Sequence, residues 1–173
     1  MESSDSQFVF QAQLTGFTLS RLKPYETWES LVHEAHLAWE SYVKVAAPTV
    51  ITRVAVRYIN RVEIPLSAFG QFEDFLTAGP NVPEPLPQGV AEFLSRVVVH
   101  EPATGAAVII TQALEPENPT NRTAPVILDI DVFKQTEFAV ESNDYWELLD
   151  RFRILKNDVF FSCLTPKALE LFK

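Results

Sequence analysis

The longest β-branched stretch of the chain covers residues 50–65 and alternates between apolar and charged positions. The mainly apolar positions are Val50, Val54, Val56, Tyr58, Val62 and Ile64, together with Thr52 and Asn60. The charged positions include three arginines, Arg53, Arg57 and Arg61. Successive side chains of a strand point to opposite faces of a sheet. The pattern therefore predicts a long central strand with one face in the core and one charged face.

The stretch 126–133 has the same alternation. Its apolar positions are Val126, Leu128, Ile130 and Val132, and its charged positions are Asp129 and Asp131. Opposite charges favour adjacent places on neighbouring strands. We therefore predict that Arg57 lies next to Asp129 or Asp131. An amide on a mainly apolar face needs partners, so we expect Asn60 to brace a neighbouring loop or helix end.

Two further pairs of alternating segments predict antiparallel hairpins. The first covers residues 8–22 and turns at Thr15-Gly16, and the second joins residues 91–100 to 107–114 through Pro102-Ala103-Thr104-Gly105. Between these hairpins, residues 69–76 can form a short helix. The prolines at 80, 83, 85 and 87 then predict an irregular surface loop, which could also serve as a polyproline ligand.

Two long amphipathic helices are expected. The first begins after the capping residue Thr27 and ends before Pro48, with Trp39 in the middle of its apolar stripe facing Val54 and Val56. The second begins at Ser142, Asn143 or Asp144 and continues to Phe160. Thr165-Pro166 then predicts a short terminal turn.

The order of these elements predicts an α+β fold. Strands come mostly in consecutive antiparallel runs, and two helices are available to cover a sheet. We therefore expect a two-layer sandwich, in which a mainly antiparallel sheet carries both long amphipathic helices on one face. At 173 residues the chain is long enough for one core, so a single domain over residues 1–173 is expected.

Composition narrows the classes of function. The formal net charge of −9 argues against a nucleic-acid-binding surface. Cys163 is the single cysteine, so an internal disulfide is excluded. The first residues lack a signal peptide, and no run approaches the roughly 18 apolar residues of a membrane span. We expect a soluble, cytoplasmic protein that binds neither nucleic acid nor membrane.

No catalytic signature accompanies the predicted strands. The sequence contains no recognisable nucleophile–base pair, glycine-rich phosphate loop or metal cluster. His33 and His36 are three residues apart on the first predicted helix, but two histidines lack the ligands that zinc needs, and a solvated polar face explains them. No catalytic residue, metal or cofactor is predicted.

The motif Arg57-Tyr58-Ile59-Asn60-Arg61 resembles that of a sporadically distributed family of bacterial proteins of unknown function. The Trp-containing helix before it, the strand Leu128-Asp129-Ile130-Asp131 and the Phe-rich helix that ends in Leu164-Thr165 are also similar. Family members usually have more N-terminal sequence, so the chain resembles a short member or the C-terminal part of one. The resemblance implies a shared fold and leaves the function open.

Three interpretations of the charged face remain. The first is a non-enzymatic protein-binding or assembly module of a bacterial or mobile-element system, which recruits a protein partner or a second copy. The second is an anion- or nucleotide-ligand sensor or enzyme that uses Arg53, Arg57, Arg61, Asp129 and Asp131. The third is a solvated cross-strand ladder with no ligand. Because Phe8 and Phe10 lie near an edge that longer relatives would cover, we expect a homodimer.

Overall fold

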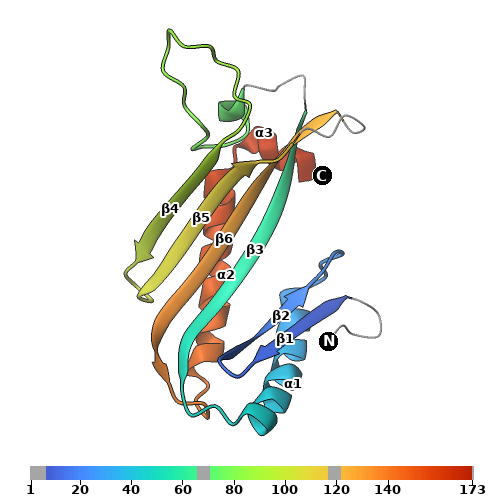
Figure 1. Ribbon diagram of the computed structural model, residues 1–173, viewed down its shortest axis with the longest axis vertical. Helices are drawn as coiled ribbons and strands as arrows, with labels where there is room; N and C mark the ends of the chain where they lie inside the picture. The colour runs from blue at the N-terminus through green and yellow to red at the C-terminus, as the bar shows by residue number, and fades with distance from the viewer. Residues whose placement is uncertain (1–6, 66–70, 117–121, 173) are drawn as a thin grey trace. The chain divides into compact units, whose positions relative to one another are not determined.

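The computed structural model describes residues 7–65, 71–116 and 122–172 (Figure 1). The chain forms two compact units, residues 1–51 and 52–173. The expectation that the whole chain is one domain stays a prediction.

The first unit consists of a β-hairpin and a long helix. Its elements are β1 (Phe8–Gln13), β2 (Gly16–Arg21) and α1 (Trp28–Ala46). The strands pair antiparallel from Phe8 opposite Arg21 to Gln13 opposite Gly16, which confirms the first hairpin. The capping role of Thr27 is also confirmed, because its hydroxyl accepts a hydrogen bond of 3.1 Å from the Ser30 amide. Ala47 caps the C-terminal end of the helix and has a left-handed backbone conformation.

An aromatic cluster joins α1 to the hairpin. The ring centroids of Phe17, Trp39 and Tyr42 lie 5.5–5.7 Å from one another. The Tyr42 hydroxyl donates a hydrogen bond of 2.9 Å to the Gln13 carbonyl. Trp39 is half-buried, and its ring contacts in this cluster are to its own unit. Its predicted position against Val54 and Val56 would join the two units, so it stays a prediction.

The second unit is built on a four-stranded antiparallel sheet. The strands are β3 (Ile51–Pro65), β4 (Leu94–Glu101), β5 (Ala106–Leu114) and β6 (Thr123–Phe138), in the order β3-β6-β5-β4 (Figure 1). The hairpin of β4 and β5 is confirmed. The prediction that residues 50–65 form a central strand is wrong, since β3 is an edge strand and the longer β6 lies inside the sheet.

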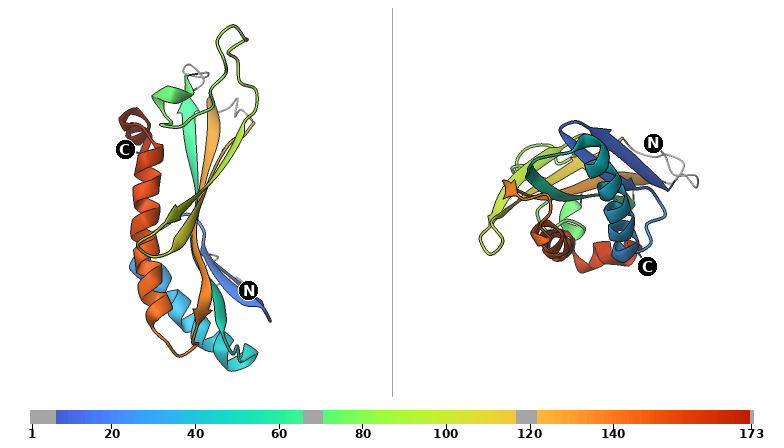
Figure 2. Two further views of the ribbon diagram at one scale, coloured as in Figure 1. Left: turned by 90° about the vertical axis from the view of Figure 1, so that its left-hand side faces the viewer. Right: turned by 90° about the horizontal axis from the view of Figure 1, so that it is seen from below.

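One face of this sheet is the core, and α2 (Asp144–Cys163) covers it (Figure 2). The predicted apolar positions of β6 are fully buried, as are Val62 and Ile64 of β3 and Phe152 of α2. The Lys156 ammonium lies 3.8 Å from the centroid of the Tyr58 ring. Burial, aided by the nearby Arg153 charge, lowers the pKa of Lys156.

The predicted α+β class with antiparallel pairing is therefore confirmed. Within residues 52–173 the sheet and α2 form two layers (Figure 2). Because α1 belongs to the other unit, the placement of both long helices on one face of the sheet stays a prediction.

The segment that follows β3 is tied to the C-terminal end of the chain. It contains the short 3₁₀ helix η2 (Phe72–Asp74), and the chain ends in α3 (Pro166–Leu169) and η3 (Glu170–Phe172). The Thr77 amide donates to the Cys163 carbonyl at 3.1 Å, and the Thr165 amide donates to the Phe75 carbonyl at 3.0 Å. The predicted helix over 69–76 is thus shorter, and Phe69 lies outside the described residues. Residues 80–89 form the expected irregular loop.

Candidate functional site

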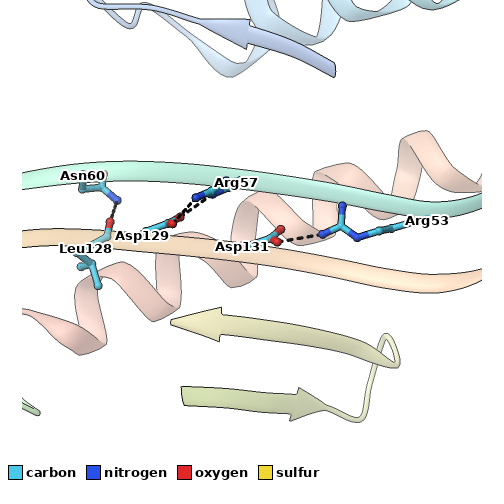
Figure 3. A network of polar contacts seen from close by, with 6 residues as sticks. All are labelled: Arg53, Arg57, Asn60, Leu128, Asp129 and Asp131. Carbon is cyan, nitrogen blue, oxygen red and sulfur yellow. Dashed lines mark hydrogen bonds and ion pairs between the residues drawn. The ribbon is translucent and has the colours of Figure 1, made fainter. Parts of the chain in front are cut away.

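Arg53 and Arg57 of β3 and Asp129 and Asp131 of β6 form a ladder of ion pairs, here called the Arg–Asp ladder (Figure 3). Arg57 binds Asp129 through two hydrogen bonds, Nε to Oδ1 at 2.9 Å and Nη2 to Oδ2 at 2.6 Å. Arg53 Nη2 donates to Asp131 Oδ2 at 2.9 Å. Arg53 precedes Arg57 in the sequence, whereas its partner Asp131 follows Asp129, as expected for antiparallel neighbours. The predicted proximity of Arg57 to these aspartates is confirmed.

The ladder lies on the sheet face opposite to α2, because it occupies the alternate positions to the buried residues of β3 and β6. The side chain of Arg57 is 58% exposed, whereas that of Asp129 is 17% exposed. The hydrogen bonds to Asp129, together with the charges of Asp129 and Asp131, raise the pKa of Arg57 despite some burial. The Arg53 guanidinium also lies 4.7 Å from the centroid of the Phe133 ring.

Arg61, the third arginine of β3, belongs to a separate ion group. It is paired with Glu63 of the same strand, and its Nε donates to Oε2 of Glu115 at 2.8 Å. The Thr123 hydroxyl donates to Glu63. The alternation places Glu63 on the same charged face as Arg61, but neither glutamate was predicted as a partner of Arg61. The spacing of Arg61 and Glu63, two residues apart and so on one strand face, was the available signal.

Within the part of the chain that the structure describes, Asn60 bonds to the sheet and not to a loop or a helix end. Its amide Nδ2 donates at 3.1 Å to the carbonyl of Leu128 in the adjacent strand β6 (Figure 3). The expectation of a loop or helix-end partner was wrong, because the backbone of the neighbouring strand supplies the acceptor. Asn60 therefore stabilises the β3–β6 pair from the core side.

The three arginines are electrostatically compensated. Each has a carboxylate partner, so an incoming anion would compete with an existing ion pair for the same guanidinium. Asp129 accepts hydrogen bonds at both carboxylate oxygens. Asp131 accepts from Arg53 at Oδ2, and its buried Oδ1 has no hydrogen-bond partner among the described residues. Over residues 7–65, 71–116 and 122–172, no three His, Cys, Asp or Glu side chains gather in a way that could hold a metal.

Comparisons with protein-family models, with curated proteins and with solved structures found no match to this chain. Among the described residues, no helix has the length and apolar character needed to cross a membrane. The interpretation of the ladder therefore depends on its own geometry.

We expect the Arg57–Asp129 pair to contribute about 1 kcal/mol or less to the free energy of unfolding, because Arg57 is largely exposed and solvent screens the pair. A double-mutant cycle of Arg57→Met and Asp129→Asn, measured by urea denaturation, determines the coupling energy. Repeating the cycle in high salt should reduce it further. A coupling of several kcal/mol that does not respond to salt would contradict this expectation.

Proposed function

We propose that this chain is a non-enzymatic protein-binding or assembly module. The observation that carries the proposal is the compensation of Arg53, Arg57 and Arg61 by carboxylates of the same unit. A site for an anionic substrate would instead keep its guanidinium groups available for the ligand. Here the arginines form a surface on which charge is already balanced.

The ladder face also carries exposed apolar side chains, which supports a protein as the ligand. Ile59 lies between Arg57 and Arg61 on the same face of β3, and it is 63% exposed. Val98 of β4 lies opposite Ile109, which in turn lies opposite Asp131, so exposed Val98 shares this face. Protein interfaces mix apolar contacts with a polar surround. A sheet surface that combines paired charges with isolated aliphatic groups matches that composition.

The rival is a sensor or enzyme for an anion or nucleotide. Arg53 and Arg57 are four residues apart on one strand, which places their Cα atoms about 13 Å from each other. Both side chains bend toward β6 and its aspartates (Figure 3). One small anion would therefore have to break two ion pairs to reach both guanidinium groups.

Thermal unfolding in the presence of nucleotides, sugar phosphates and divalent metals distinguishes the two functions. We expect no ligand in the panel to raise the melting temperature of the wild-type chain. Arg57→Ala tests the ladder, and Arg151→Ala, an exposed arginine on α2, is the matched control. A stabilising ligand whose effect is lost in Arg57→Ala and kept in Arg151→Ala would replace the proposed function with the rival.

Membership of the bacterial family with the Arg-Tyr-Ile-Asn strand is part of this proposal and is supported by residues 57–61 and 128–131. The proposed partner is a protein, either a different chain or a second copy in a homodimer. The cytoplasm, where single cysteines stay reduced, is the proposed compartment.

A further inference from the structure

The outer edge of β4 is an exposed apolar strand. Val97, Val98 and Val99 are consecutive and are 51%, 44% and 46% exposed. The strand is the last in the order β3-β6-β5-β4, and within the described part of the chain no other strand pairs with its outer side (Figure 1). Such an edge is a template for pairing with another chain.

The register shows which backbone groups face outward. The Leu114 amide donates to the Phe93 carbonyl at 3.1 Å, and the pairing continues with Leu94 opposite Ala113. Hydrogen-bonded and non-hydrogen-bonded pairs alternate along an antiparallel ladder. The odd-numbered residues of β4 therefore bond to β5. Leu94, Arg96, Val98 and His100 direct their N–H and C=O groups to the free side.

The two edge strands of the sheet, β3 and β4, differ in the features that prevent pairing with another chain. Strands that avoid pairing carry charges, prolines or bulges along the edge. β3 carries three arginines and Glu63. The centre of β4 has none of these devices: its three valines are uninterrupted, and its pairing with β5 is continuous from Leu94 to Glu101.

We propose that the outer edge of β4 pairs antiparallel with β4 of a second copy, about a two-fold axis at Val98, to form a continuous eight-stranded sheet. The inference rests on the proposed function and names its partner as the chain itself. Pairing of the outward groups of Arg96, Val98 and His100 forms about six backbone hydrogen bonds between the copies. The exposed valines become buried against each other.

The position of the axis follows from the side chains. Directly opposed residues of antiparallel strands point to the same face of the sheet. A two-fold axis must therefore lie midway between one residue and the same residue of the partner. With the axis at Val98, Val97 lies opposite the partner's Val99, and every valine meets a valine. An axis at Val97 would place Val99 opposite Ser95, and an axis at Val99 would place Val97 opposite Glu101.

The flanking residues fit the same axis. Arg96 lies opposite the partner's His100, and Ser95 lies opposite the partner's Glu101. No carboxylate faces a carboxylate, and no arginine faces an arginine. The Glu101 carboxylate is also occupied in its own chain. It accepts hydrogen bonds from the Thr104 hydroxyl and from the amides of Ala103 and Thr104, and these bonds lower its pKa.

Light scattering at micromolar concentration tests the pairing. The wild-type chain is expected at twice the mass of a single chain, and Val98→Lys at the single mass, since the two lysines would face each other at the axis. Ile154→Lys adds the same charge at an exposed position on α2 and should stay dimeric. Denaturation midpoints of both variants close to each other show that Val98→Lys has not simply unfolded the chain.

Cysteine cross-linking tests the register. Two Val98→Cys chains would have Cα atoms about 5.5 Å apart at the axis, within disulfide range, whereas two Leu94→Cys chains would be about 27 Å apart. Leu94 is on the same strand and face and is more exposed, at 73%, so it controls for random collision. The wild-type chain controls for the native Cys163. Val98→Cys should give a covalent dimer under mild oxidation, and Leu94→Cys should not.

The outcomes separate this inference from the proposed function. A monomeric wild-type chain, or a dimer that survives Val98→Lys, overturns the β4 pairing and leaves the protein-binding role intact. Equal cross-linking of Leu94→Cys and Val98→Cys also overturns it. A ligand that stabilises the chain through Arg57 overturns the proposed function, whether or not β4 pairs.

Discussion

Phe152→Ala is expected to lower the free energy of unfolding by about 3–5 kcal/mol. Phe152 is fully buried in α2, and α2 packs against β6, whose apolar positions are also fully buried. Truncation removes the transfer free energy of the ring and leaves a cavity that a sheet and helix of fixed spacing cannot close. Urea denaturation followed by circular dichroism measures the change.

Phe161→Ala is the matched control for this substitution. It removes the same atoms from the same helix. However, Phe161 is 57% exposed, and its ring makes a T-shaped contact with the ring of Phe160. We expect this variant to lose about 1 kcal/mol or less. Equal losses in the two variants would mean that α2 covers the sheet with a different face.

The alternation of apolar and polar residues was sufficient to predict most of the fold. It identified the two long strands and their buried sides, because burial on one face of a sheet imposes a period of two. Capping chemistry identified the start of α1, where Thr27 binds the Ser30 amide. Thr165 acts in the same way before α3, where its hydroxyl accepts from the Ala168 amide. These are local effects that neighbouring residues determine.

Strand order was not predictable in the same way. Residues 50–65 were expected at the centre of the sheet because they are β-branched, but β6 takes that place. Alternation shows which side of a strand is buried and says nothing about how many neighbours the strand has. A high content of β-branched residues indicates that a segment forms a strand, but it does not indicate whether that strand is central or at an edge.

The candidate site was predicted in part. The proximity of Arg57 and Asp129 followed from charge and alternation, whereas the partners of Arg61 did not. Glu115 follows directly after β5, and its distance from Arg61 depends on the strand order that the sequence left open. The bond from Asn60 to the Leu128 carbonyl depends on strand order in the same way.

Phe75→Ala is expected to destabilise the second unit by about 3–5 kcal/mol. Phe75 is almost completely buried, and its carbonyl accepts a hydrogen bond from the Thr165 amide. Its neighbour Leu76 forms a β-bridge with Leu164. The Lys167 ammonium of α3 lies 5.0 Å from the centroid of the Phe75 ring. The aromatic ring therefore anchors the segment after β3 to the junction of α2 and α3.

The two sides of that junction lie about 90 positions apart in the sequence. They are also joined by hydrogen bonds from the Thr77 hydroxyl to the Ser162 carbonyl and from the Thr165 hydroxyl to the Asp74 carbonyl, and by the Lys167–Asp74 ion pair. Loss of the buried ring should loosen these polar contacts together.

Hydrogen exchange distinguishes this role from ordinary loss of core packing. In Phe75→Ala the amides of Thr77 and Thr165, which donate across the junction, should exchange faster than those in the middle of β6. Phe172→Ala is the matched control, because Phe172 is exposed at the C-terminal end and its ring contacts Phe160. It should leave the exchange of Thr77 unchanged. If Phe75→Ala accelerated β6 and the junction equally, the segment would be an ordinary part of the core and not a separate anchor.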